Sequence, residues 1–382
     1  MAHRSSLAFV AAMVLGCSGA PQHHAGDPEQ AHADASVARG SAAIAAAMRG
    51  SHRSPGAADR DQYRHPVETL AFLGFTPTMT VLDIGPGAGY YTELLVPVLA
   101  KDGRYLATNR EPPSTAATPS GHHWSPYEGV RFDDLLRAAP ELYGKVQVIR
   151  VNYEAPQLNL DGKVDMVLLM REVHMMKNWG TLDTWLREIH RALKPNGILG
   201  VEDHRAAPGA NPEETVQKGY LPEAWVIEKI EAAGFALAGK SEINANPRDT
   251  KDYPNGVWSL PPSFQAGPDY TPADARDRAK YAPIGESDRM TLKFVRVADG
   301  AARGVLPTSP ATSPRTALRA QRMLEPAPLP VPPEPEPAPL PPRSPRLGAG
   351  AGMPASRPPP LPTPASVAIG VVPGPVEPVA PG

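Results

Sequence analysis

The stretch Val81-Leu-Asp-Ile-Gly-Pro-Gly-Ala-Gly89 decides the fold. Its apolar start predicts a strand, and its glycines predict a tight turn into a helical segment at 90–99. Another helical segment, 66–73, precedes it. In a unit of strand, glycine loop and helix, the glycines let the backbone approach a ligand, and N–H groups of the loop and helix start face an anion. The stretch therefore predicts an α/β domain with a ligand-binding loop at one edge of its sheet.

The spacing of the glycines restricts the kind of ligand. A dinucleotide-binding loop has the pattern G-x-G-x-x-G. Here Gly85, Gly87 and Gly89 alternate, and Asp83 stands two residues before the first of them. This spacing disfavours an oxidoreductase that uses a nicotinamide cofactor.

Apolar patterns downstream of the loop predict the remaining elements of an α/β fold. The run 164–170 is almost continuously apolar, which is typical of a parallel strand buried on both faces. In 181–193 the apolar residues recur at the spacing of one helix face. We expect further strands at 103–109, 145–151, 236–243 and 290–297, and a further helix at 223–234. The segment 194–203 is expected to turn from helix to strand, with Asn196-Gly197 as the turn.

Two of these segments resemble class I S-adenosylmethionine (SAM)-dependent methyltransferases. Asp83 and the alternating glycines resemble motif I of that family, and 186–203 resembles its helix, Lys-Pro-Gly-Gly turn and fifth strand, with Asn196 in place of the first glycine. The segment from Arg64 to Gly74 is similar to the start of a group of predicted exported bacterial methyltransferases. The resemblance implies a Rossmann-like, seven-stranded and mostly parallel sheet, with helices on both faces and an antiparallel terminal strand. It also implies SAM as the cofactor and methyl transfer by in-line displacement.

The resemblance also implies which residues contact the cofactor. In that family the loop backbone, here 85–89, embraces the methionine part of SAM, and the acidic strand residue, here Asp83, helps to hold the loop and the amino group. Asn109 stands near the expected place of the acid that binds the ribose, and Glu154 falls where contacts to the adenine are usual. The alternatives are that Asn109 is a polar turn residue and Glu154 an ordinary loop residue.

Polar residues after the strand 164–170 are the catalytic candidates. Arg171, Glu172 and His174 match the family segment that lines the cavity near the transferable methyl group. An imidazole can take a proton from a hydroxyl or amine near neutral pH, so His174 is a candidate general base. The alternative is that His174 opens a helix and is satisfied by packing.

Two further segments bear on the site. Prolines and aromatic residues in 246–287 suggest either a lid on the substrate side or an ordinary surface insertion. The histidines at 122, 123 and 204 show no metal-ligand spacing, and we expect surface or loop positions for them and no metal site.

The N-terminus has the pattern of an export signal. A short basic start, an apolar run and the sequence Val14-Leu-Gly-Cys17 resemble a bacterial lipobox, in which the cysteine is lipidated. We therefore expect a lipoprotein signal peptide at 1–17, an anchor at Cys17, and a location in the cell envelope, on the periplasmic side or at the outer membrane. The alternative is an ordinary secretory signal that contains a cysteine.

Composition divides the remaining chain. Residues 18–53 predict a flexible tether, with room for a helical turn or two at 41–49, and residues 54–300 predict the methyltransferase domain. Half of the 48 prolines lie after Gly304, so 301–382 is predicted to be a disordered tail that can engage a protein partner. The formal net charge is −2 without an extended basic stripe, which argues against nucleic acid as a partner. Cys17 is the single cysteine, so no intramolecular disulfide can form.

The sequence thus predicts a SAM-dependent methyltransferase that acts on an unidentified acceptor, expected to be a small molecule. SAM is made in the cytosol, whereas the predicted signal directs the chain outward. The alternative is therefore a non-catalytic envelope lipoprotein that reuses the fold as a ligand-binding or interaction module.

Overall fold

A computed structural model describes residues 28–110, 126–266 and 271–298 of the chain. The predicted signal peptide with Cys17 and the whole of the predicted Pro-rich tail lie outside the described residues, so lipidation and disorder stay predictions. Within the part that is described, no helix combines the length and the apolar character needed to cross a bilayer.

The described residues form a seven-stranded sheet with the order β3-β2-β1-β4-β5-β7-β6. Strands β1 to β5 pair in parallel, and β7 pairs antiparallel with both β5 and β6. The predicted fold class is therefore confirmed. The strands are β1 (Thr80–Ile84), β2 (Arg104–Arg110), β3 (Gln147–Val151), β4 (Val164–Met170), β5 (Leu193–His204), β6 (Phe235–Ser241) and β7 (Arg289–Arg296).

The central strands are apolar on both faces because both faces are covered. Along β4, Met166 and Leu168 belong to one core cluster and Val167 and Leu169 to the other, as the alternation of a strand requires. This explains the near-continuous apolar run in the sequence.

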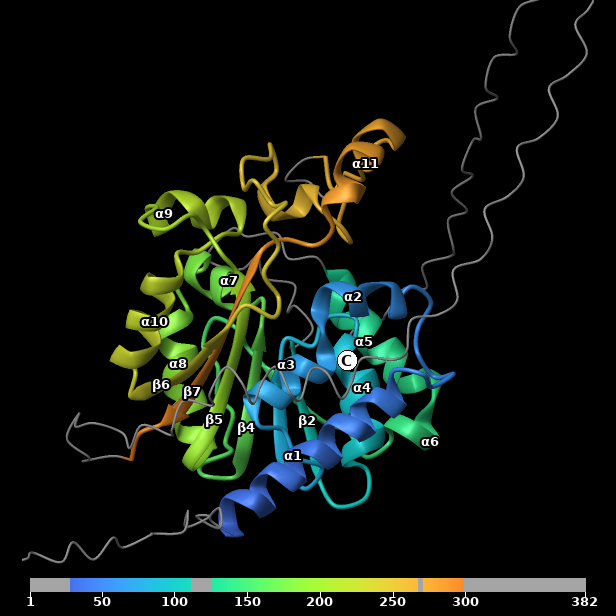
Figure 1. The fold of residues 1–382 in the computed structure, drawn as a ribbon, viewed down its shortest axis with the longest axis vertical. Helices are drawn as coiled ribbons and strands as arrows, with labels where there is room; N and C mark the ends of the chain where they lie inside the picture. Colours follow the sequence, from blue (N-terminus) through green and yellow to red (C-terminus); the bar gives the residue numbers. More distant parts are fainter. Residues whose placement is uncertain (1–27, 111–125, 267–270, 299–382) are drawn as a thin grey trace, which may run out of the picture. The chain divides into compact units, whose positions relative to one another are not determined.

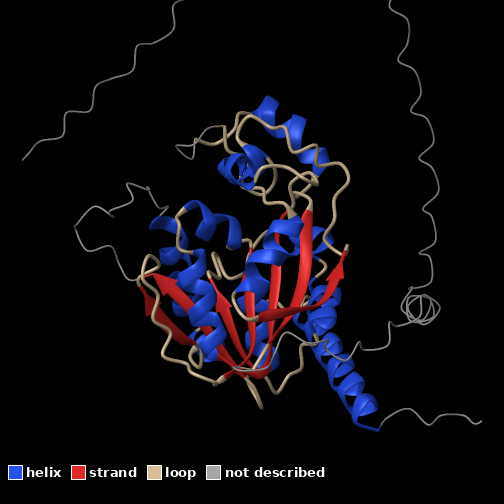
Figure 2. Cartoon of the chain, turned by 90° about the vertical axis from the view of Figure 1, so that its left-hand side faces the viewer, coloured by secondary structure: helices blue, strands red, loops and turns tan. Residues whose placement is uncertain are grey.

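Helices cover each face of the sheet (Figures 1 and 2). One face packs against α7, α8 and α10, and the other against α1, α3, α4, α5 and α6. The α-helices are α1 (Pro28–Ala47), α2 (Asp61–Arg64), α3 (Pro66–Leu73), α4 (Tyr90–Leu99), α5 (Pro126–Ala138), α6 (Pro140–Tyr143), α7 (Val173–Asn178), α8 (Leu182–Ala192), α9 (Pro212–Thr215), α10 (Glu223–Ala232) and α11 (Ala275–Tyr281). Short 3₁₀ turns lie at Ala58–Arg60, Val216–Lys218, Gly256–Ser259 and Ala282–Ile284.

Local sequence fixes several element ends at the predicted places. Helix α3 begins with Pro66, whose missing N–H costs nothing at a first helical position, and ends at Gly74, which has a φ of 85°. Asn196 has a φ of 61°, the left-handed conformation that asparagine tolerates in the turn where the family has glycine.

The tether predicted for 18–53 is wrong for much of its length. Residues 28–47 form α1, which packs against α3 and α4 (Figure 1). Gly40, Ile44 and Ala47 are buried on one side of this helix. Most other residues of the segment are small or polar, and composition alone does not show that the few apolar ones share one side of a helix.

The segment between β6 and β7, here called the flap (242–288), extends beyond the end of the sheet at which β5 finishes (Figure 1). It is tied to β5 by backbone and side-chain bonds, among them Arg205 N–H to the Asp288 carbonyl at 2.9 Å. Trp258 of the flap lies 6.1 Å from the ring of His174, measured between ring centroids. The flap therefore lies on the side of the sheet where the site residues gather.

We predict that Ile44→Ala destabilises the domain by about 2–5 kcal/mol, because the Ile44 side chain is fully buried against α3 and α4. Urea denaturation would measure the change in the free energy of unfolding. Ala42→Ser on the exposed side of the same helix is the control and should change it by less than about 0.5 kcal/mol. Equal small effects of both variants would mean that α1 contributes nothing to the domain.

Candidate active site

The glycine loop follows β1 and has the backbone conformation that only glycine adopts easily. Gly85, Gly87 and Gly89 have φ values of 65°, 58° and 89°. A Cβ added at Gly85 would lie 2.5 Å from the Glu172 side chain, and one at Gly89 would lie 2.2 Å from Leu135. At Gly87 an added Cβ would meet nothing within 4 Å. The two ends of the loop are thus packed, whereas its middle faces open space.

Asp83 supports the loop from below. Its side chain is buried, and its Oδ2 accepts a hydrogen bond from the Tyr105 hydroxyl at 2.7 Å. Burial raises the pKa of Asp83 to about 7, although the Tyr105 bond and the charge of Arg171 act in the opposite direction. No motif of the sequence pointed to Tyr105, which lies on β2.

The start of the loop is fixed by a neighbouring strand. The Gly85 N–H donates to Oγ1 of Thr108 at 3.1 Å, and the same hydroxyl lies 2.9 Å from the hydroxyl of Tyr153. These contacts join the ends of β1, β2 and the loop after β3. They hold the loop in place without using its middle.

Asn109 and Glu154 occupy their predicted positions, with different surroundings. Asn109 is buried at the end of β2, where its amide nitrogen donates to Asp133 at 2.9 Å and its oxygen accepts the Arg110 N–H at 2.9 Å. Glu154 is exposed in the loop after β3. Asn109 is thus held by protein partners, while Glu154 lies on the surface.

Arg171 follows β4, the strand next to β1, and so stands beside the glycine loop. Its φ of 62° is unusual for a side chain of this size. Its backbone N–H donates to the Glu202 carbonyl at 2.6 Å, and its Nη1 lies 3.3 Å from the Glu202 carboxylate. Despite burial, which acts in the opposite direction, Glu202 and Glu286 hold the pKa of Arg171 above its ordinary value.

His174 is paired with an aspartate that the sequence analysis missed. Nδ1 of His174 lies 2.7 Å from Oδ1 of Asp203, and the His174 backbone N–H donates to Oδ2 of Asp203 at 3.0 Å. Both side chains are buried. With the Nδ1 proton directed to the carboxylate, Nε2 is the nitrogen that can accept a proton.

His204 differs from the surface or loop position expected for it. It is the last residue of β5, partly buried, with its ring centroid 4.9 Å from that of His174 and its Nδ1 bonded to the Ser287 hydroxyl. Burial, followed by His174 and Arg171, lowers the pKa of His204 well below its usual value, which favours a neutral ring. Ligand atoms of His174, Asp203 and His204 lie within 4.8 Å of one another, so the structure groups residues of metal-ligand type that are separated in the sequence. Their bonds to each other and to Ser287 make the group a hydrogen-bonded network.

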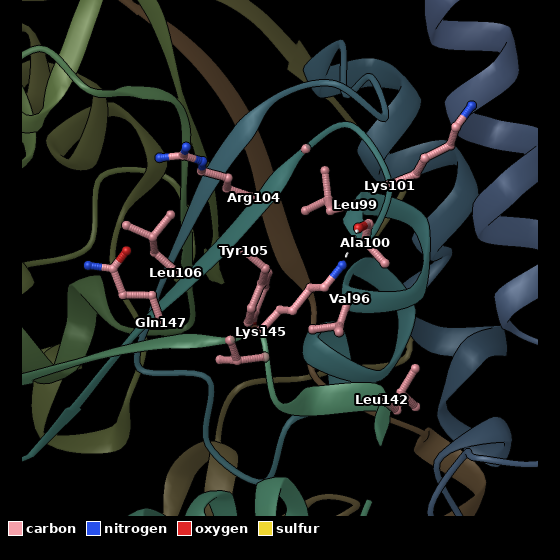
Figure 3. Close-up of a pocket in the computed structure, with 12 residues that line it drawn as sticks. Val96, Leu99, Ala100, Lys101, Arg104, Tyr105, Leu106, Leu142, Lys145 and Gln147 are labelled. Carbon is pink, nitrogen blue, oxygen red and sulfur yellow. Dashed lines mark hydrogen bonds between the residues drawn. The ribbon is translucent and has the colours of Figure 1, made fainter. Parts of the chain in front are cut away.

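A surface pocket of ≈ 380 Å³ lies elsewhere, between α4 and the first residues of β2 and β3 (Figure 3). Arg104 and Gln147 begin these strands, and the ammonium group of Lys145 donates to the Ala100 carbonyl. Ligands of parallel α/β sheets bind at the carboxyl ends of the strands. This pocket at the amino ends is therefore separate from the site around the glycine loop.

Comparisons with known proteins place a methyltransferase domain in the same part of the chain. A family model described as "Methyltransferase domain" matches residues 57–231. No curated protein matched the chain.

Solved structures with some likeness include a SAM-dependent methyltransferase from Aquifex aeolicus (19% identity, 64% of this chain and 94% of that one, TM-score 0.39). Others are the [4+2]-cyclase SpnF (19%, 65% and 85%, 0.42) and an arsenic(III) SAM methyltransferase from Chlamydomonas reinhardtii (14%, 60% and 66%, 0.36). At TM-scores this low, these structures give no evidence about the fold beyond what the strand order of the sheet already provides.

We predict that Asp83→Asn changes how stability depends on pH. The folded-state pKa of about 7 lies above the ordinary value of 3.8, so ionisation of Asp83 destabilises the folded wild type progressively as pH rises from about 4 to about 7. The asparagine cannot ionise, so the variant should gain stability relative to the wild type over that interval, by up to about 4 kcal/mol at roughly 1.4 kcal/mol per pKa unit. Urea denaturation at several pH values checks this, with the exposed Asp102→Asn as the control for loss of one carboxyl group. Parallel curves for wild type and Asp83→Asn would contradict the prediction.

The site fits the cofactor that the fold implies. The middle of the loop leaves space at Gly87 where a Cβ would meet no atom, and polar residues stand at the ends of β2, β4 and β5 around it. Residues 57–231 thus match a methyltransferase-domain model, and the strand order and glycine loop of this part of the chain are those expected for the class I methyltransferase fold.

Proposed function

We propose that the chain is a SAM-dependent methyltransferase that acts on a small-molecule acceptor, whose hydroxyl or amine gives up its proton to His174. The observation that carries the proposal is the buried His174–Asp203 pair at the same end of the sheet as the glycine loop, with a distance of 2.7 Å between Nδ1 and Oδ1. SAM supplies an activated methyl group when bound. The acceptor supplies the electron pair, and Nε2 of His174 takes the proton that the acceptor loses.

Asp203 has two roles in this proposal. Its carboxylate orients the imidazole through Nδ1, which leaves Nε2 as the acceptor, and its negative charge stabilises the protonated ring. The same carboxylate receives the backbone N–H groups of His174 and His204, so its own position is fixed. The arrangement is that of a general base held in one tautomer.

The glycine loop would hold the methionine part of SAM through its backbone, and Asp83 would support the loop from the buried side. We keep Asn109 and Glu154 as proposed contacts to the ribose and adenine. The exposure of Glu154 and the protein partners of Asn109 mean that both contacts would require local rearrangement. Export and lipid anchorage at Cys17 are a separate proposal that rests on the sequence alone.

We predict that Gly87→Ala abolishes binding of SAM while the domain stays folded. The new methyl group would meet no protein atom and would project into the space proposed for the cofactor. The left-handed backbone should cost only about 1–2 kcal/mol of stability. Isothermal titration with SAM measures the loss.

Gly162→Ala is a matched control for this experiment. Gly162 has a φ of 63° and open space at its Cβ position. It lies just before β4, at the amino ends of the parallel strands and thus opposite the glycine loop. It should suffer the same backbone strain and keep its affinity for SAM. Equal affinities for both variants, or a wild type that does not bind SAM, would contradict the proposed site.

We predict that His174→Gln lowers kcat about 100-fold or more once an acceptor is found, because the proton acceptor is lost. Release of S-adenosylhomocysteine across a panel of hydroxyl and amine compounds would identify the acceptor and then give kcat. SAM affinity should be unchanged. His190→Gln is the control and should keep full activity, because the ring of His190 contacts the Val297 carbonyl, away from the site. A His174→Gln variant with normal kcat would exclude the general-base role.

A further inference from the structure

Four arginines share two carboxylates beside the glycine loop. Glu286 of the flap lies 3.0 Å from Arg60, 3.0 Å from Arg64 and 2.8 Å from Arg289. Glu202 lies 2.9 Å from Arg289 and 3.3 Å from Arg171. We call these six residues the arginine cluster: Arg60, Arg64, Arg171, Arg289, Glu202 and Glu286. The formal charge of the arginine cluster is two units positive. Most of its side chains are buried, and unpaired charge is costly in a protein interior.

Arg64 shows the shortage of acceptors most directly. Its side chain is 1% exposed, its Nε is shared with Glu286, and its Nη1 has no hydrogen-bond partner among the described residues. Burial, followed by the charge of Arg171, lowers the pKa of Arg64 to about 9. A buried guanidinium with an unbonded nitrogen is unusual in a folded protein.

Two other arginine networks of the same domain have at least as many carboxylates as arginines. Arg205 places Nε, Nη1 and Nη2 on Glu223, Glu242 and Asp288. Arg53 pairs with two carboxylates, those of Asp61 and Glu93, at 3.0 and 3.2 Å. The excess of arginines over carboxylates thus distinguishes the arginine cluster from the networks around Arg205 and Arg53.

The arginine cluster lies next to the proposed cofactor site. The Arg64 guanidinium carbon lies 4.6 Å from the ring centroid of Tyr90, the first residue of the helix that follows the glycine loop. Arg171 follows β4 and stands beside the loop, and its side chain is 24% exposed. Arg60 is 27% exposed at the other side of Glu286. Two of the four guanidinium groups thus reach the surface of the cluster while Arg64 lies within it.

We propose that Arg60, Arg64 and Arg171 form a binding site for a carboxylate or similar small anionic group of a bound ligand. Guanidinium groups recognise such groups through paired N–H donors, and the anion would reduce the excess positive charge. The proposal rests on the proposed function for its location. Two ligands can supply the anion there, the methionine carboxylate of SAM or an acidic group of the acceptor.

The first arm of the test compares SAM with decarboxylated SAM by isothermal titration. If the cofactor supplies the anion, the wild type should bind SAM at least tenfold more tightly, and Arg64→Met should abolish this preference while Arg64→Lys keeps part of it. Arg60→Gln, at the partly exposed edge of the cluster, is a second variant that should weaken the preference even if Arg64→Met fails to fold. Arg205→Met, which removes an arginine from an ion-pair network with enough carboxylates, is the control and should leave the preference intact.

The second arm titrates acetate and inorganic phosphate into the protein, with and without saturating SAM. Anion binding in the presence of SAM that is lost in Arg60→Gln or Arg64→Met would support the site and assign it to the acceptor. Equal affinity for both forms of SAM, together with no arginine-dependent anion binding, would overturn the inference. If the wild type binds neither form of SAM, the proposed function fails, and the titration without SAM alone decides for or against the anion site.

Discussion

Parallel pairing of β1, β4 and β5 is the constraint on which the site depends. Because these strands run in the same direction side by side, the residues that follow them meet at one edge of the sheet. The glycine loop comes from β1, Arg171 and His174 follow β4, and Asp203 lies at the end of β5. A chain separation of 29 residues between His174 and Asp203 is thereby reduced to a hydrogen bond of 2.7 Å.

The flap adds a second constraint through charge. Glu286 joins it to Arg60 and Arg64 near the start of the domain, and Ser287 and Asp288 join it to His204 and Arg205 at the end of β5. Glu286 is almost fully buried, yet Arg64, Arg289 and Arg60 hold its pKa below the ordinary value against the effect of burial. The flap is therefore fixed by ion pairs as well as by a small apolar cluster in which its Val257 packs with Ala206 and Tyr220.

The sequence predicted what local chemistry determines. The glycine loop, the helices α3 and α4 and the strand β4 follow from glycine spacing, proline placement and apolar runs, so their positions were readable without a structure. The roles of Asp203, Tyr105 and Arg64 were missed, because they come from partners that are distant in the chain. An acidic residue at the end of β5 was a usable signal for Asp203, since parallel strands place such residues at one edge. Nothing comparable marked Tyr105, whose hydroxyl reaches Asp83 from inside a strand.

Helix α1 also limits how far an anchored domain could travel. With the helix starting at Pro28, only residues 18–27 separate it from Cys17, in place of the longer tether expected from composition. Fully extended, such a link spans at most about 40 Å. If Cys17 carries a lipid, the first turn of α1 stays within that distance of the membrane surface. The enzyme would then sample a thin layer of the compartment, and its acceptor would have to enter that layer.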